Sequence, residues 1–154
     1  MTAVEIDPHR ASELRANLAT MGRGDVTVVE ADGTALPPEL NRFDRVLVDA
    51  PCSGLGVLSQ RPDLRWRATP LAELQTALLR SAAERVRPGG TILYSVCTLN
   101  PDECEAVVDA SGLRIEPLGD EWPQYTHPSR PEFLLTLPHV HGTSGFFVAR
   151  LIAD

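Results

Sequence analysis

The chain has 154 residues, with 14 basic and 21 acidic residues and a formal net charge of −7. This length predicts one modest domain over residues 1–154, and a hydrophobic fraction of 43% is enough to build a core. No apolar run approaches the roughly 20 residues of a transmembrane helix, and no charged-then-apolar leader opens the chain. We therefore expect a cytoplasmic protein with no membrane contact.

The net acidity counts against a nucleic-acid-binding protein, because the surfaces that bind nucleic acid are usually basic. The charge is unevenly distributed, however. Residues 1–50 carry five arginines and nine acids (−4), residues 51–99 six arginines and three acids (+3), and residues 100–154 three arginines and nine acids (−6). The middle of the chain is therefore the part that could face an anionic partner.

Strand and helix patterns alternate through the first fifty residues. Residues 2–6 are short, apolar and β-branched, which predicts a strand. Asp7 can cap a helix whose first position is a proline, and Gly22 stands where a helix commonly ends. Residues 26–29 and 45–48 predict two more strands, the second nearly continuous in apolar residues, as buried parallel strands are.

A long loop at residues 50–69 precedes the next predicted helix. We expect Thr69 and Pro70 to cap this helix and the Pro-Gly-Gly of residues 88–90 to stop it. Residues 91–95 then predict a fourth strand. The apolar residues at helical spacing, which predict the buried face of the helix, are Leu71, Leu74, Leu78 and Ala82.

The last third is less regular. Residues 100–103 resemble a capping box with proline at the first helical position, so a short helix is expected to about residue 110. Residues 113–115 predict a short strand, residues 117–142 show no clear periodicity, and residues 146–149 predict the last strand. The alternation predicts a three-layer α/β domain with a mostly parallel sheet.

Acidic residues close three of the predicted strands. In open α/β sheets the ligand lies beyond the carboxyl ends of the strands, and Glu5, Asp32 and Asp49 stand at such ends. Glu5 could accept hydrogen bonds from ribose hydroxyls, or it could simply cap the following helix. Asp32 could likewise bind a ligand or form a turn.

Two of the three cysteines also follow strand ends. Cys52 and Cys97 each open a loop at the predicted active edge, where exposure and a lowered pKa would make a thiol reactive. Cys104 falls in the predicted helix, where a cysteine usually serves as a small apolar residue. Three irregularly spaced cysteines without a CxxC motif predict neither a disulfide framework nor a zinc site, so a functional cysteine would act as a thiol.

Two of these segments carry a resemblance to a known family. DAPCSG at residues 49–54 and YSVCTLNPDE at residues 94–103 resemble the paired cysteine signatures of the RNA cytosine carbon-5 methyltransferases, the Sun/Fmu (RsmB-like) family. Residues 4–7, 61–66 and 142–147 resemble that family's ribose-binding strand end, its loop after the first cysteine and its closing strand. The resemblance implies a Rossmann-like fold that binds S-adenosylmethionine and methylates RNA, with ribosomal RNA preferred.

The family also suggests a role for each candidate residue. Cys97 would attack carbon 6 of cytosine and activate carbon 5 toward the methyl group, and Cys52 would assist the later release of the enzyme. Asp49 would hydrogen-bond the cytosine ring near the methyl donor. Glu5 and Asp32 would bind the ribose and adenine ends of S-adenosylmethionine.

The DNA cytosine methyltransferases leave an alternative open. They also carry a Pro-Cys after the corresponding strand and use that cysteine as the nucleophile, which would make Cys52 the attacking residue. The second cysteine motif favours Cys97 instead. Covalent trapping of RNA by Cys52→Ala and Cys97→Ala variants would separate the two assignments.

A basic and aromatic cluster lies in the positive middle of the chain. Arg61, Arg65 and Arg67 surround Trp66, so these side chains could bind phosphates and stack on bases. The alternative is a solvated loop with one core tryptophan. Three other candidates, His127, His139 and His141, do not have a recognised metal spacing and are expected to be surface or loop histidines, so no metal is predicted and the oligomeric state is left open.

The sequence also departs from the family. Its glycine-rich, donor-binding loop and first strand should precede Glu5, and its basic RNA-binding region should lie further upstream. The expectation is therefore an N-terminally truncated methyltransferase fold. Two hypotheses follow: the chain is the C-terminal catalytic part of such an enzyme, or it is a noncatalytic fragment or partner subunit that needs another polypeptide to complete its sheet.

Overall fold

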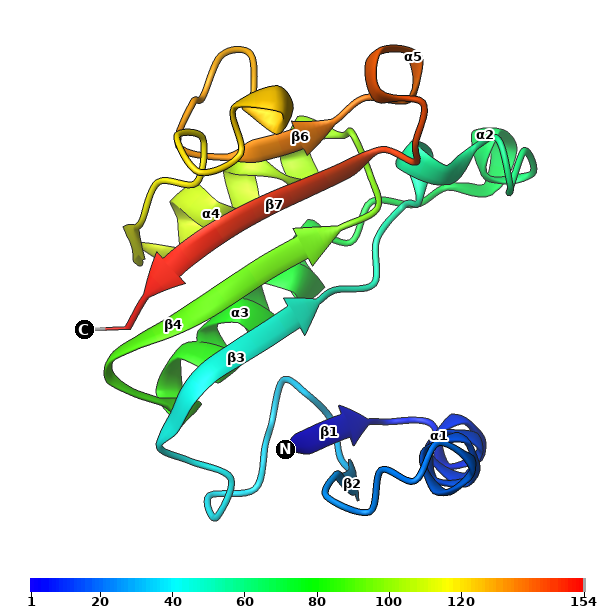
Figure 1. The fold of residues 1–154 in the computed structure, drawn as a ribbon, viewed down its shortest axis with the longest axis vertical. Helices are drawn as coiled ribbons and strands as arrows, with labels where there is room; N and C mark the ends of the chain where they lie inside the picture. Colours follow the sequence, from blue (N-terminus) through cyan, green and yellow to red (C-terminus); the bar gives the residue numbers. More distant parts are fainter. Residues whose placement is uncertain (154) are drawn as a thin grey trace. The chain divides into compact units, whose positions relative to one another are not determined.

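The structure is a computed structural model that describes residues 1–153 (Figure 1). It divides into two compact units, residues 1–40 and the residues from 41 onward. None of the helices in the described part is both long and apolar enough to cross a membrane. The prediction of one partial catalytic domain stays a prediction.

The first unit is a single strand–helix–strand motif. Strand β1 (Thr2–Glu5) and strand β2 (Thr27–Glu30) pair in parallel, from Thr2 opposite Thr27 to Glu5 opposite Glu30, and helix α1 (Pro8–Thr20) connects them. The Asp7 carboxylate accepts a hydrogen bond from the Arg10 amide at the start of α1, and Gly22 (φ +66°) follows its end. The predicted strands, helix and caps are thus confirmed.

The second unit contains the larger sheet. Its strands are β3 (Phe43–Asp49), β4 (Val86–Val96), β5 (Arg114–Ile115), β6 (Leu134–Thr136) and β7 (Phe146–Ile152). Its α-helices are α2 (Leu64–Arg67), α3 (Ala72–Arg85), α4 (Glu105–Ser111) and α5 (Pro138–His141), with single 3-10 turns at Leu55–Val57, Pro101–Glu103 and Pro123–Tyr125.

The sheet is mixed, so the prediction of a mostly parallel sheet is wrong for this unit. The strand order is β3-β4-β7-β5, with β6 also paired to β7. Strands β3 and β4 are parallel, whereas β7 runs antiparallel to β4, β5 and β6. An apolar run such as the one in β7 indicates a buried strand but carries no information on the direction of that strand.

Helices α3 and α4 lie on one face of this sheet, behind the strands in Figure 1. The strand residues that face them are fully buried, and they belong to β4 and β7. They include Ile92, Tyr94, Val96, Phe147, Ala149 and Leu151. This unit by itself therefore has two layers, and the predicted third layer stays a prediction.

The passage from α3 to β4 differs from the prediction. The helix ends at Arg85, and the strand already begins at Val86, so the Pro-Gly-Gly segment lies inside β4 as a bulge. Gly89 has a φ of +73°, and a Cβ atom on Gly90 would lie 2.9 Å from the Asp44 carbonyl oxygen of β3. Gly90 thus allows a close approach of β3 and β4, and Gly89 allows the positive φ of the bulge, so neither glycine stops a helix.

The predicted face and cap of α3 are also partly wrong. Leu74 is 40% exposed, whereas Gln75 and Leu79 are fully buried. The N-cap residue is Leu71, which makes no side-chain capping hydrogen bond, so the Thr69–Pro70 cap is not formed. The apolar periodicity predicted the wrong buried face because a polar residue, Gln75, lies in the core. Its side chain is buried there with hydrogen-bond partners.

Candidate active site

The site lies where β3 and β4 end. Asp49, the last residue of β3, pairs in register with Ser95 of β4, so the loops that follow the two strands start side by side. We call residues 50–56 and 97–100 the cysteine loops. The Cys52 and Cys97 sulfur atoms lie 3.4 Å apart, and both side chains are half-buried free thiols. The structure therefore brings together the two cysteines that the sequence singled out.

The residue after each cysteine joins the two loops. The Ser53 and Thr98 hydroxyl oxygens lie 2.8 Å apart in a hydrogen bond, and these side chains are 3% and 0% exposed. The Gly56 amide donates to the Cys97 carbonyl oxygen at 3.0 Å. Buried hydrogen bonds of this kind fix a loop strongly, because an unpaired polar group there would cost free energy.

The buried carboxylate of Glu103 also holds the first cysteine loop in place. Its Oε1 atom accepts hydrogen bonds from the Ser53 amide (2.9 Å), the Leu71 amide (3.1 Å) and the Gln75 side chain (3.0 Å). Burial raises the pKa of Glu103, but the hydrogen bonds led by that from Ser53 outweigh it and leave the pKa below its usual value. The Tyr94 hydroxyl donates to the Glu103 backbone carbonyl at 2.7 Å.

This arrangement corrects the predicted capping box. Residues 101–103 form a 3-10 turn whose cap is the Asn100 side chain, which accepts from the Asp102 amide at 3.2 Å. The Glu103 carboxylate instead supplies the acceptor for the Leu71 amide at the start of α3. It also orients Gln75, which donates to the Pro51 carbonyl oxygen at 2.8 Å just before Cys52.

The glycine-rich start of β7 closes against the first cysteine loop. The Gly145 amide donates to the Gly56 carbonyl oxygen at 2.8 Å. A Cβ atom on Gly56 would lie 2.1 Å from the Gly145 carbonyl oxygen, which no side chain permits. The absence of a side chain at position 56 therefore allows the GTSGFF segment to reach the cysteine loops.

The cysteines differ in environment. Burial above all, and then the contact with Cys97, raises the pKa of Cys52, and the Gly54 amide offsets this only in part. Cys104 is 2% exposed, and its thiol donates to the Thr98 carbonyl oxygen at 3.6 Å. Burial also raises the pKa of Cys104, so this residue is an inert packing group, as predicted.

The three candidate carboxylates lie in different settings. Asp49 is exposed beside the cysteine loops and accepts a hydrogen bond from the Ser95 hydroxyl at 3.0 Å. In the first unit, Glu5 accepts from the Asp7 amide (2.9 Å) and from Arg10 (2.8 Å). Asp32 accepts from the amide and hydroxyl of the second residue after it, and these bonds lower its pKa. Both acids therefore have the local cap and turn contacts that the sequence left open.

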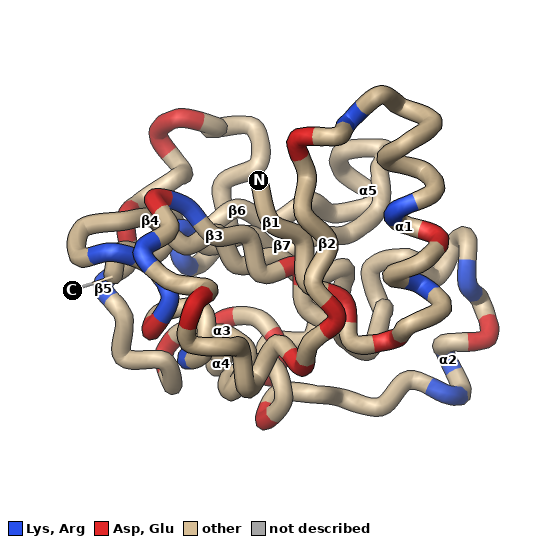
Figure 2. The backbone as a smooth tube through the Cα atoms, turned by 90° about the horizontal axis from the view of Figure 1, so that it is seen from below, with Lys and Arg blue, Asp and Glu red and all other residues tan. Residues whose placement is uncertain are grey.

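The arginine–tryptophan segment, residues 61–67, lies on the surface and includes α2 (Figure 2). Trp66 is 85% exposed, so the alternative of a core tryptophan is wrong. Asp63 pairs with Arg61 at 3.1 Å and with Arg67 at 3.8 Å, which offsets part of the positive charge.

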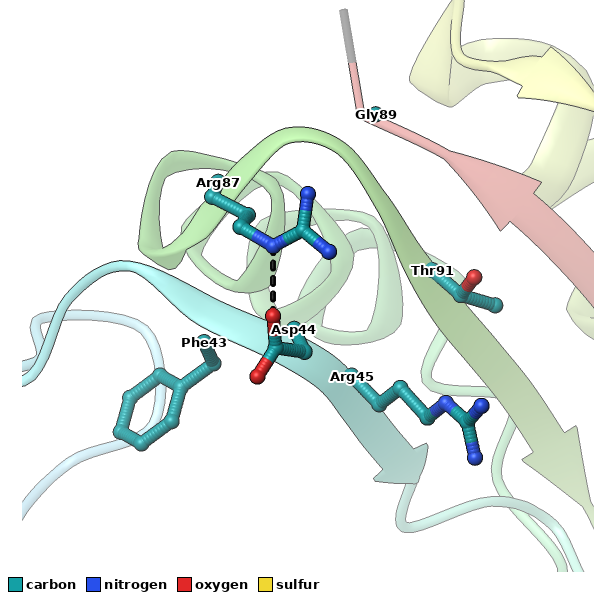
Figure 3. Close-up of a pocket in the computed structure, with 6 residues that line it drawn as sticks. All are labelled: Phe43, Asp44, Arg45, Arg87, Gly89 and Thr91. Carbon is teal, nitrogen blue, oxygen red and sulfur yellow. Dashed lines mark hydrogen bonds and ion pairs between the residues drawn. The ribbon is translucent and has the colours of Figure 1, made fainter.

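A pocket of the second unit lies away from the cysteine loops. It has a volume of about 640 Å³ and sits at the amino end of β3, whereas the cysteines follow its carboxyl end. An Asp44–Arg87 ion pair of 2.5 Å crosses it (Figure 3). It is lined by Phe43, Asp44, Arg45, Arg87, Gly89 and Thr91. Its position excludes it from the candidate site.

The histidines follow the prediction only in part. His127 lies in a loop but is 6% exposed, with Nε2 2.8 Å from a Glu105 carboxylate oxygen and Nδ1 accepting from the Arg130 amide. The predicted surface or loop position is thus met by the loop, although the His127 side chain is buried. Among residues 1–153, no cluster of three His, Cys, Asp or Glu side chains could hold a metal ion.

Sequence reasoning missed four residues that shape the site: Ser53, Gln75, Thr98 and Glu103. A signal was present for two of them, since Ser53 and Thr98 each follow a candidate cysteine directly. Gln75 and Glu103 had no such signal, because their partners are distant in sequence and their patterns resemble an ordinary helix and cap.

Comparison with solved structures defines the class of protein. The crystal structure of PH0851 superposes with a TM-score of 0.89 at 31% identity, covering 98% of this chain and 36% of that one. NSun6 from Pyrococcus horikoshii, determined with SFG, superposes with a TM-score of 0.85 at 30% identity, covering 99% of this chain and 41% of that one. The fold is that of an α/β methyltransferase.

Sequence comparison gives the family. The model of the family described as 16S rRNA methyltransferase RsmB/F matches residues 1–152, and the chain belongs to this family of RNA cytosine-5 methyltransferases. A probable ribosomal RNA small subunit methyltransferase B of Synechocystis is 43% identical over 92% of this chain. Ribosomal RNA small subunit methyltransferase F of Salmonella paratyphi B is 40% identical over 97%. The chain spans about a third of the length of these relatives, 35% and 34%.

Proposed function

We propose that the chain carries the catalytic cysteines of an enzyme that methylates carbon 5 of cytosine in ribosomal RNA. The observation that supports this most is the pair of half-buried thiols, 3.4 Å apart at the ends of two parallel strands, in a chain of the RsmB/F family. Ribosomal RNA is the proposed substrate because the relatives' names refer to the small ribosomal subunit.

In the proposed reaction the Cys97 thiolate attacks carbon 6 of a cytosine that has left its stack. The new sulfur–carbon bond pushes electron density to carbon 5, which then accepts a methyl group. Loss of the carbon 5 proton and cleavage of the bond to Cys97 release the product, with Cys52 assisting this release. The raised pKa of Cys52 supports this division of roles, because a thiol that keeps its proton is the poorer nucleophile.

S-Adenosylmethionine would supply the methyl group when bound. The carboxylates available at strand ends fit this donor chemically, because they accept hydrogen bonds from ribose hydroxyls and from amino groups. Asp49 is exposed and close in sequence to Cys52, so we assign it to both the donor and the cytosine ring. We assign Glu5 and Asp32 to the ribose and adenine ends.

RNA contact is assigned to the arginine–tryptophan segment. The exposed indole of Trp66 offers a stacking surface, and Arg61, Arg65 and Arg67 offer phosphate contacts. The exposure of Trp66 supports this assignment, because an exposed tryptophan stabilises no core.

A methylation assay tests the proposal. The chain is incubated with S-adenosylmethionine and small-subunit ribosomal RNA, and the nucleosides are then analysed by mass spectrometry. We expect 5-methylcytidine from the unmodified chain and from a Cys104→Ser variant, and none from Cys97→Ser. Equal product from Cys97→Ser would contradict the proposed nucleophile.

One observation favours a second candidate, a chain that works with another polypeptide. Strand β3 forms an outer edge of its sheet, and within the described residues no strand pairs with that edge. Its Leu47 side chain is 63% exposed. Calorimetric titration with S-adenosylmethionine separates the candidates: micromolar binding by the isolated chain would argue against the need for a second polypeptide.

A further inference from the structure

The contact between Cys52 and Cys97 also has the geometry from which a disulfide forms. Their sulfur atoms lie 3.4 Å apart, and a disulfide needs about 2.05 Å, so an approach of little more than 1 Å would bond them. Side-chain rotation and small loop shifts cover such a distance.

The surrounding contacts keep the two sulfurs together. Ser53 and Thr98 join the residues that follow the cysteines, and Glu103 holds the Ser53 amide. Loops tied in this way cannot carry the thiols apart, so the effective concentration of one thiol near the other is high.

Exposure distinguishes this pair from the third cysteine. Cys52 and Cys97 are half-buried, which leaves room for a small oxidant, whereas Cys104 is 2% exposed and its thiol donates to the Thr98 carbonyl oxygen. Oxidation of cysteine follows exposure and thiolate character. The pair should therefore react and Cys104 should not.

We propose that Cys52 and Cys97 form a peroxide-sensitive thiol switch, in which a hydroperoxide converts the pair into an internal disulfide and a thiol reductant restores it. The consequence for activity rests on the proposed function, because the disulfide would occupy both sulfurs that methyl transfer requires. The formation of the bond does not depend on that function.

The chemistry balances in two steps. The Cys97 thiolate attacks the O–O bond of the hydroperoxide, becomes a sulfenic acid, and the alcohol (water, for hydrogen peroxide) leaves with a proton. Cys52 then attacks that sulfur, the disulfide forms and water leaves, so two thiols are oxidised and one hydroperoxide is reduced. We assign the first attack to Cys97 because burial raises the pKa of the Cys52 thiol. Cys52 then gives its proton to the departing hydroxide as it attacks the Cys97 sulfur.

Peptide mapping tests the bond directly. The reduced chain is treated with hydrogen peroxide, blocked with N-ethylmaleimide, digested without reductant and analysed by mass spectrometry. We expect one peptide pair linked through Cys52 and Cys97, with Cys104 alkylated only after denaturation and the link lost with dithiothreitol. Separate alkylation or separate oxidation of Cys52 and Cys97, or a link to Cys104, would overturn the proposal.

Two variants test which cysteines form the link and in what order they react. Cys104→Ser should give the same linked peptides. Cys52→Ser should leave a sulfenic acid on Cys97 that reacts with dimedone. An unlinked Cys104→Ser chain, or a Cys97 that stays unmodified in Cys52→Ser, would contradict the proposed order of events.

Methyl transfer is measured on parallel samples of the reduced and the peroxide-treated chain that are neither blocked with N-ethylmaleimide nor digested. Oxidation should reduce it by at least about tenfold, and dithiothreitol should restore it. A linked chain that keeps its activity refutes the switch. A reduced chain that transfers no methyl group refutes the proposed function and leaves the mapping result unaffected, so the two failures are distinguishable.

Discussion

The cysteine loops and the arginine–tryptophan segment are built in opposite ways. The cysteine loops are held by a network of buried hydrogen bonds. Its members Glu103, Ser53 and Thr98 are almost without solvent contact. The arginine–tryptophan segment presents an indole that is 85% exposed. The two cysteines proposed to react are thus held in fixed positions, whereas the side chains proposed to contact RNA lie on a surface that adds little to stability.

Removal of the Glu103 carboxylate should disrupt the buried hydrogen bonds that hold the cysteine loops. Glu103→Ala leaves the Ser53 and Leu71 amides and the Gln75 side chain without their acceptor, so we expect a loss of about 3–5 kcal/mol in the free energy of unfolding. Urea unfolding followed by circular dichroism measures it. Asp102→Ala, at an exposed neighbouring position, is the control and should leave the midpoint unchanged.

The charge of Glu103 should make this contribution depend on pH. Its folded-state pKa lies below its usual value of 4.5, so the carboxylate stabilises the fold fully above that pH and loses this effect as the pH falls through the folded value. The stability difference between the unmodified chain and Glu103→Gln should thus be constant near neutral pH and shrink below about pH 4.5. If this stability difference instead grows as the pH falls, the pKa of Glu103 is not lowered in the folded state.

The hydrogen bond between the Ser53 and Thr98 hydroxyls should contribute less to the free energy of unfolding than Glu103 does. Ser53→Ala and Thr98→Val each remove one partner of a buried hydrogen bond, and we expect a cost of about 1–2 kcal/mol for each. The double variant should cost less than the sum of the two, because the second substitution removes a group that is already unpaired. Strict additivity in urea unfolding would show that the bond does not couple the loops.

Trp66 should have the smallest effect on stability. Trp66→Ala should leave the unfolding midpoint unchanged while weakening RNA binding by about 1–3 kcal/mol, the usual contribution of one stacked base. Trp122→Ala, which removes an indole that is 49% exposed, is the matched control for binding. Equal RNA affinities for the two variants would refute the assigned stacking role.

The sequence predicted the parts of this molecule that depend on local pattern. The strand–helix–strand order of the first unit, the Asp7 cap and the meeting of Cys52 with Cys97 follow from periodicity, capping and the rule for strand ends. The sequence-based prediction failed for features that depend on contacts between residues far apart in the chain. The direction of β7 and the buried position of Glu103 depend on contacts across tens of residues, which no local pattern records.

The central claim, that Cys97 is the nucleophile and Cys52 assists release, is tested most directly by trapping. Cys52→Ala and Cys97→Ala variants are incubated with S-adenosylmethionine and small-subunit ribosomal RNA, and covalent protein–RNA complexes are separated on a denaturing gel, with Cys104→Ala as control. We expect Cys52→Ala to accumulate the complex and Cys97→Ala to form none. A complex that persists in Cys97→Ala and vanishes in Cys52→Ala would contradict it and make Cys52 the nucleophile.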